Sequence, residues 1–306
     1  MRPGMTLWIP ITIAAAFVQN LRFMLQKHLK ATGLSTTGAT FARFVFAAPL
    51  AILLVAILTG SGAYSIPGLS GRFFALAMIG GVAQILATML VVALFAERNF
   101  TVGITLKKTE TMQTALVAFL VLGEVVSSWG LLALVIGLVG VVLLSDPPKQ
   151  DQPLRWQSRV FNKASGYGLL SGALFGVSAT GYRGASLALG GGDFLIRAAA
   201  TLAFVTLFQT LVMLVWLAWR DRAEIRRVMQ AWRVTALVGL SGVLGSICWF
   251  MAFTLQNAAY VKALGQIELV FTFLASWLWF RETSTAREIF GIVLIVASIM
   301  VLVMAL

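Results

Sequence analysis

The chain has 306 residues, of which 59% are hydrophobic and only 11% are charged. Soluble domains carry roughly 45–50% apolar and about 25% charged residues, so this chain lacks the charge to cover a soluble surface, and its hydrophobicity excludes disorder. The mean hydropathy of +0.93 indicates a membrane protein. The net charge of +12 is typical of basic cytoplasmic loops, and we expect no nucleic-acid partner.

The scarcity of cysteine and histidine excludes several chemistries. The chain has one cysteine, Cys248, and one histidine, His28, so no disulfide forms within it, and neither a zinc site nor a Cys–His dyad is expected. No P-loop, nucleophile elbow or dinucleotide fingerprint occurs. We therefore expect no cofactor, no metal and no enzyme activity.

Ten apolar windows follow one another along the chain, and a helix that crosses a bilayer needs roughly 20 such residues. They lie at residues 6–26, 35–58, 73–95, 100–121, 128–145, 165–187, 194–218, 233–255, 259–280 and 288–305. None shows the strict alternation of a membrane strand. We predict an all-α polytopic membrane protein with ten transmembrane helices.

The windows fall into two sets of five, separated by the polar segment 146–163. An offset of 158 residues pairs Glu110 with Glu268 and Glu124 with Glu282. These pairs indicate a duplicated five-helix unit, with a first repeat at 1–145, a cytoplasmic linker at 146–163 and a second repeat at 164–306. Because five is odd, the second repeat enters the membrane from the opposite side, which gives the inverted repeat found in many secondary transporters.

The loop charges predict the orientation in the membrane. In the ten-span arrangement, 14 lysines and arginines lie on one side and 3 on the other. The positive-inside rule then places the loops between spans 5 and 6 and between spans 7 and 8 in the cytoplasm, and both termini outside. We expect a multi-pass protein of a bacterial-type inner membrane.

Polar side chains inside the spans are the candidate functional residues, since each charge costs about 2.5–3.5 kcal/mol on insertion scales. Candidates for lining a substrate cavity are Phe17, Gln19, Asn20, Arg22, Gln84, Glu110, Gln113, Trp249, Tyr260, Gln266 and Glu268. Candidates for structural or gating charges are Arg43, Lys107, Arg183, Arg197, Glu124 and Glu282.

Each of these residues has a structural interpretation beside the functional one. Lys107 and Glu110, three residues apart, can pair on one helix face, and Lys108 then points elsewhere. Arg43 and Arg197, related by an offset of 154, can hold helices together or gate a path. A carboxylate beside a cavity can carry a coupling proton or meet a substrate amino group.

Four segments resemble the drug/metabolite transporter superfamily in its ten-helix EamA-type form. They are TFARFVFAAPL with Arg43, FLIRAAA with Arg197, ETMQTALVAFLVLGE and IELVFTFLASWLWFRE. In that family, a span-two arginine and a fourth-span segment ending in Gly-Glu recur in each repeat. Three features of this chain depart from that pattern. The usual fourth-span proline is absent, and Lys107 and Lys108 form an unusual charge pair there. In the second repeat, Arg281 stands where the Gly-Glu pattern has its glycine.

The resemblance implies a central cavity between two four-helix halves and a carrier of small organic solutes, with a YddG-like amino-acid exporter as the expected subtype. We predict a secondary transporter that exports amino acids, including aromatic ones, or related metabolites by alternating access. Its partners are a small-molecule substrate, the lipid bilayer and, as a candidate, coupled protons. A carrier of another solute (a sugar, nucleotide-linked metabolite or drug) is the alternative, and an intramembrane enzyme or a scaffold is less favoured.

Overall fold

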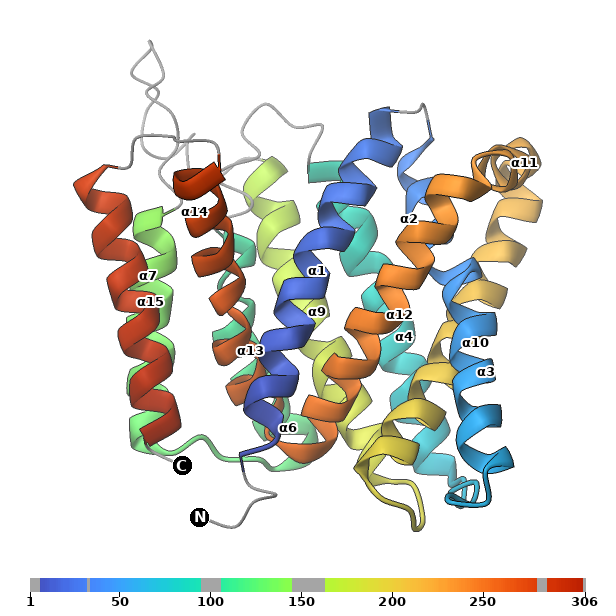
Figure 1. The fold of residues 1–306 in the computed structure, drawn as a ribbon, viewed down its shortest axis with the longest axis horizontal. Helices are drawn as coiled ribbons and strands as arrows, with labels where there is room; N and C mark the ends of the chain where they lie inside the picture. Colours follow the sequence, from blue (N-terminus) through green and yellow to red (C-terminus); the bar gives the residue numbers. More distant parts are fainter. Residues whose placement is uncertain (1–5, 32–33, 95–105, 145–162, 280–284, 305–306) are drawn as a thin grey trace. The chain divides into compact units, whose positions relative to one another are not determined.

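The computed structural model describes residues 6–31, 34–94, 106–144, 163–279 and 285–304, and every regular element within these ranges is a helix (Figure 1). In chain order the helices are α1 (Trp8–Ala31), α2 (Thr36–Val45), α3 (Ala47–Gly60), α4 (Gly71–Leu94), α6 (Glu110–Leu122), α7 (Ser128–Leu144), α9 (Lys163–Leu187), α10 (Phe194–Arg220), α11 (Arg222–Gln230), α12 (Trp232–Leu255), α13 (Ala258–Gly265), α14 (Ile267–Trp279) and α15 (Ala286–Met304).

The helices have the length and surface of a membrane protein. Five described segments are long and apolar enough to cross a bilayer: Thr36–Gly60, Gly71–Leu94, Phe194–Arg220, Trp232–Leu255 and Ala286–Met304. The helices α6 and α7 are also apolar but shorter. Large apolar side chains such as Leu120 and Trp219 are 70% and 79% exposed. The predicted all-helical membrane architecture is confirmed, whereas the ten spans in two inverted repeats stay a prediction.

The helices gather into two compact units, and each unit takes segments from both halves of the chain. Unit 1 comprises residues 1–85 and 178–257, and unit 2 comprises residues 86–177 and 258–306. The long helices α4 and α9 each contribute to both units.

In unit 1, α1 runs beside α12, and α10 packs against α2, α3 and α12 (Figure 1). The segment from Thr36 to Gly60 is interrupted at Phe46, where α2 ends and α3 begins. Pro49 lies in the first turn of α3, where its missing N–H leaves no hydrogen bond unmade. The residues therefore favour a break at this point.

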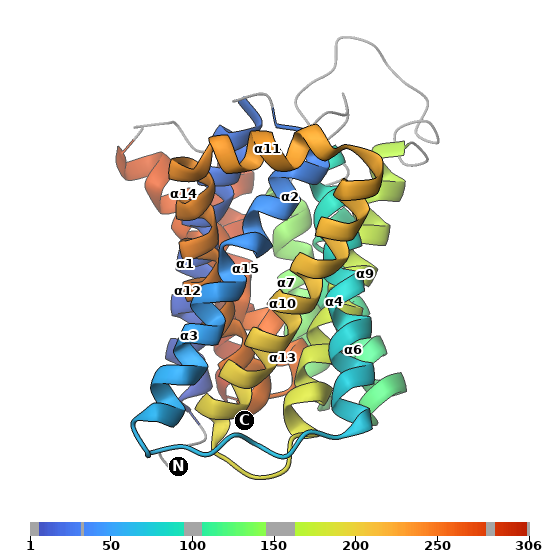
Figure 2. The ribbon, with the colours of Figure 1, turned by 90° about the vertical axis from the view of Figure 1, so that its right-hand side faces the viewer.

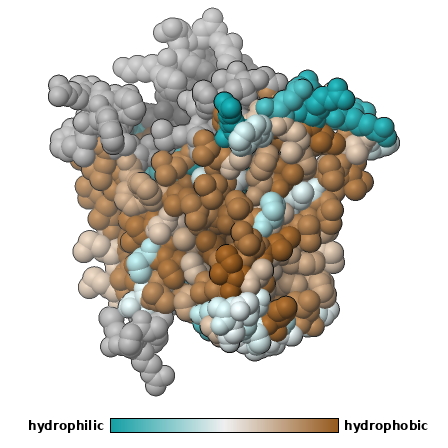
Figure 3. Space-filling view, turned by 45° about the vertical axis from the view of Figure 1, so that its right-hand side comes forward, coloured by the Kyte–Doolittle hydropathy of each residue, from teal (hydrophilic) through white to brown (hydrophobic). Residues whose placement is uncertain are grey.

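The short helix α11 lies across one end of unit 1 and packs against α2, α10 and α12 (Figure 2). The carboxylate of Glu224 is fully buried and accepts a hydrogen bond from the Ser35 N–H at 2.7 Å. Arg227 pairs with Glu224 at 2.5 Å. Hydrophilic side chains gather where α11 lies, above a hydrophobic flank (Figure 3), as expected for a helix at a membrane boundary.

In unit 2, α7 and α15 pack closely through small residues. A Cβ added at Gly140 would lie 2.8 Å from the Gly291 carbonyl oxygen, so the helix backbones touch at this crossing. Small residues allow such approaches between membrane helices. Ser298 strengthens the contact, because its hydroxyl donates to the Ala133 carbonyl at 2.7 Å.

Candidate substrate-binding and gating sites

Two helices of unit 2 are interrupted at positions that the sequence offset of 158 relates. A turn at 108–109 precedes α6, which begins at Glu110, and a turn at Gln266 separates α13 from α14. Glu268 is the second residue of α14. Glu110 and Glu268 therefore both lie in the first turn of a half-helix, where the helix dipole favours a negative charge.

Three lysines surround these two glutamates. Lys107 and Lys262 each pair with one carboxylate oxygen of Glu110, at 2.9 and 2.5 Å. Lys108 pairs with Glu268. The five side chains are only 10–18% exposed, so solvent screens these pairs weakly. The predicted pairing of Lys107 with Glu110 is observed, and Lys108 does point away from it, toward Glu268.

Polar side chains hold the two helix breaks in place. Thr109 donates its hydroxyl to the Leu106 carbonyl at 2.6 Å and accepts a hydrogen bond from Gln113 at 3.1 Å. Gln266 donates its amide to the Thr111 hydroxyl at 3.0 Å. Two of the predicted cavity residues, Gln113 and Gln266, thus stabilise the breaks.

An aromatic ring supports the lysine side of the cluster. The ammonium groups of Lys107 and Lys262 lie 4.9 and 5.7 Å from the centre of the Phe175 ring. A cation over an aromatic face is stabilised by about 0.5–2 kcal/mol. The ring therefore helps to keep both lysines beside Glu110.

A second polar group lies in unit 1 around Gln209 of α10, which is fully buried. Its amide nitrogen donates to the Gly81 carbonyl and to Gln84 Oε1, each at 3.0 Å, and to the Tyr182 hydroxyl at 3.2 Å. Tyr182 donates to Gln84 at 2.9 Å, and its ring stacks on Phe250 with centres 4.5 Å apart. The network joins α4, α9, α10 and α12.

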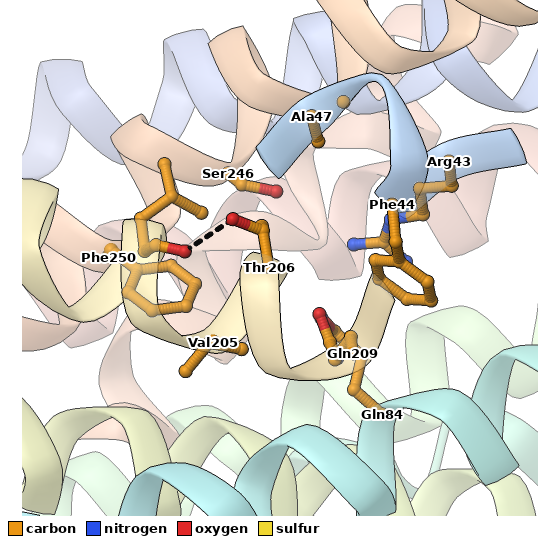
Figure 4. Close-up of a pocket in the computed structure, with 11 residues that line it drawn as sticks. Arg43, Phe44, Ala47, Gln84, Val205, Thr206, Gln209, Ser246 and Phe250 are labelled. Carbon is orange, nitrogen blue, oxygen red and sulfur yellow. Dashed lines mark hydrogen bonds between the residues drawn. The ribbon is translucent and has the colours of Figure 1, made fainter. Parts of the chain in front are cut away.

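A pocket beside this network is lined by residues of α2, α3, α4, α10 and α12 (Figure 4). The lining residues are Arg43, Phe44, Ala47, Gln84, Leu202, Val205, Thr206, Gln209, Gly242, Ser246 and Phe250. The cavity volume is about 10 Å³, which is room for about one water molecule. Thr206 donates its hydroxyl to the Leu202 carbonyl at 2.8 Å, the dashed line in Figure 4.

Arg43 and Arg197, which the predicted repeat relates, have different surroundings. Arg43 is 6% exposed and lines the pocket, and its guanidinium lies 5.2 Å from the centre of the Phe44 ring. Arg197 is only half-buried in the first turn of α10, and its Nε donates to the Gly191 carbonyl at 3.1 Å. Arg43 is thus the one of the two that the structure brings to the pocket.

Arg183 and Tyr260 make contacts that stabilise helix ends. Arg183 donates to the Phe253 and Gln256 carbonyls, both at 2.6 Å, where α12 ends and its carbonyls lack helical partners. The Tyr260 hydroxyl accepts a hydrogen bond from the Ser127 N–H at 2.8 Å in the turn before α7.

The other predicted residues are dispersed within their units. On α1, Phe17 is 53% exposed, Gln19 and Asn20 are half-buried and Arg22 is buried. Trp249 is buried and stacks on Phe253, with ring centres 5.7 Å apart, and it does not line the pocket. Glu124 follows the α6 cap residue Gly123, and Glu282 lies outside the described residues.

Sequence reasoning missed Gln209 and the partner of Lys108. A single glutamine in the apolar run of α10 is a weak signal, although Thr206, Gln209 and Thr210 share the three- and four-residue spacing of one helix face. The pairing of Lys108 with Glu268 joins residues 160 positions apart, so no local spacing could indicate it.

Comparisons with known proteins identify relatives of this chain by sequence and by fold. Residues 165–304 match the EamA-like transporter family. A solved structure titled "Crystal structure of protein" is 10% identical and superposes with a TM-score of 0.70, covering 97% of this chain and 96% of its own, which shows a likeness in fold. A search of the curated proteins found no match. In this segment, which is just under half of the 306 residues, the chain is similar to the EamA-like transporter family.

Proposed function

We propose that the protein exports amino acids, including aromatic ones, or related small metabolites across the inner membrane by alternating access. Residues 1–145 and 164–306 form two inverted five-helix repeats in this proposal, with ten spans and both termini outside. The observation that carries it is the pair of helix breaks at Glu110 and Glu268, each with its carboxylate beside a lysine.

Broken helices support a transport role. Secondary transporters use discontinuous helices to place half-helix ends at the path of the solute. The turns at 108–109 and at Gln266 lie at positions related by the same offset that relates Glu110 and Glu268, as an internal duplication requires.

The ion pairs join the two proposed repeats reciprocally. Glu110 of the first repeat pairs with Lys262 of the second, and Glu268 of the second pairs with Lys108 of the first. A movement of one repeat against the other must break one or both pairs. Protonation of either glutamate removes the attraction to its lysine, so these pairs give a route for coupling transport to protons.

The basic helix α11 supports the proposed orientation. It carries Arg222, Arg226 and Arg227, and Arg220 and Arg233 flank it. The positive-inside rule places such a segment in the cytoplasm. A reporter that is active only in the cytoplasm should therefore be active when inserted after Gln230 and inactive when fused to Leu306.

The test of the function is a substrate screen with the purified full chain in liposomes. Radiolabelled amino acids are offered one at a time, with and without a pH gradient. We expect saturable flux of at least one amino acid, faster with the gradient. Flux of none of them would refute the amino-acid assignment, and flux unaffected by the gradient would refute proton coupling.

Variants test the proposed gating pairs. Glu110→Gln and Glu268→Gln keep the size of each side chain but remove its charge, so we expect flux to fall at least about tenfold in each. Glu288→Gln, at the start of α15 and outside the cluster, is the matched control and should retain flux. Normal flux in both glutamate variants would refute their role.

A further inference from the structure

The pocket of unit 1 contains a buried hydrogen-bond acceptor that is not used. Gln209 is 0% exposed, and its nitrogen makes the three hydrogen bonds described above. Among the residues that the structure describes, no donor reaches its Oε1. Gln209 is one of the residues that line the pocket (Figure 4). A buried acceptor without a partner costs about 1–3 kcal/mol, which favours a site that a ligand completes.

The other side of the pocket is rich in donors. Arg43 contributes a guanidinium, whose planar fork matches a carboxylate, and Ser246 contributes a hydroxyl. The eleven lining residues include no aspartate or glutamate. The pocket therefore presents positive charge to a ligand from Arg43 and a neutral acceptor from Gln209, between the apolar rings of Phe44 and Phe250.

We infer that this pocket binds the zwitterionic head group of the transported solute, with the carboxylate on Arg43 and the ammonium donating to Oε1 of Gln209. The inference rests on the proposed transport function and narrows its substrates to α-amino acids. A neutral amine, a sugar or an apolar drug has no group that matches the guanidinium.

In the described state this pocket has room for about one water molecule, so an amino-acid head group does not fit without a rearrangement. Arg43 and Phe44 precede the break at Phe46, and Ala47 follows it. A change at this break moves one wall of the pocket relative to the other. Binding therefore requires an opening at the junction of α2 and α3.

Binding and flux are measured separately, so that failure of the site and failure of the function can be told apart. The purified full chain in detergent is titrated with each of the twenty amino acids by calorimetry. The best binder is then compared with its amide, which lacks the carboxylate charge, and with its amine, which lacks the carboxylate. We expect both analogues to bind about 10–100-fold more weakly, the range that corresponds to one charged hydrogen bond.

Two kinds of variant test the location of the site. Ser246→Met fills the cavity without touching a charge, and Ser241→Met, on the same helix but outside the pocket lining, is its matched control. Arg43→Gln removes the charge, and Arg43→Lys restores it without the fork. We expect Kd and KM to rise at least about tenfold in Ser246→Met and Arg43→Gln, less in Arg43→Lys, and not in Ser241→Met.

Each outcome decides between the claims. If the wild type transports but Kd and KM are unchanged in folded Ser246→Met and Arg43→Gln, the proposed site is overturned and the transport function stands. The cavity would then hold a structural water only. Binding that depends on Arg43 without flux would support the site and refute the function. Absence of both would overturn both.

Discussion

The ion pair between Lys262 and Glu110 gives a quantitative prediction. Its two side chains are 18% and 10% exposed and lie 2.5 Å apart. Exposed pairs contribute about 0.2–1 kcal/mol, whereas removal of one partner of a fully buried pair costs about 3–5 kcal/mol. Because this pair is nearly buried, we expect a coupling energy of about 2 kcal/mol, between these limits.

The assay is a double-mutant cycle with Lys262→Met, Glu110→Gln and the combination. Unfolding is followed in mixed micelles by tryptophan fluorescence, and the coupling energy is the departure of the double variant from the sum of the singles. The matched control is the pair of Arg227 and Asp221, which lie 3.0 Å apart but are 50% and 44% exposed.

The control cycle, with Asp221→Asn and Arg227→Met, should give a coupling energy below about 1 kcal/mol. If the Lys262 and Glu110 cycle gives the same small value, the reasoning that burial strengthens this pair is refuted.

Three further substitutions test the packing, each by the unfolding midpoint. Gly140→Ala should lower the free energy of unfolding by about 1–3 kcal/mol, because its Cβ would lie 2.8 Å from a backbone oxygen. The control Gly166→Ala places its Cβ where no atom lies within 4 Å, so it should be neutral or stabilising. Equal effects of the two variants would contradict the close helix crossing. Tyr260→Phe removes hydrogen bonds to Ser127 at 2.8 and 3.2 Å and should cost about 1–2 kcal/mol; an unchanged midpoint would show that these bonds contribute nothing. Asp193→Ala removes the side chain that caps α10 and should lower the free energy of unfolding by about 1 kcal/mol. Asp193→Asn keeps the hydrogen-bond acceptor and should be destabilised less. Equal destabilisation in the two variants would refute the capping role.

The helices could be predicted from the sequence because apolar windows of bilayer length determine them. Nine of the ten predicted windows coincide with one helix or with two consecutive helices, and the described part of the remaining window, at 100–121, contains α6. The interruptions at Phe46 and Gln266 were not predicted at those residues, since each lies inside one predicted window. The pairing of Lys107 with Glu110 followed from helix periodicity, which is a local property.

The site could be predicted only in part, for a physical reason. Sequence reasoning finds residues that are costly in a membrane, such as Arg43 and Glu110, but tertiary packing decides their neighbours. Gln209 is less costly than a charge, and its importance comes from Gln84 and Tyr182, which are distant in sequence. Burial on α10 turns an ordinary glutamine into the centre of a network.

The central claim is amino-acid transport, and counterflow tests it most directly. Liposomes that contain the purified protein are preloaded with an unlabelled amino acid and diluted into a trace of the labelled one. The account predicts transient accumulation of label that depends on the preload and is lost in Glu110→Gln protein that remains folded. Absence of counterflow for every amino acid, in liposomes that demonstrably contain folded protein, would contradict it.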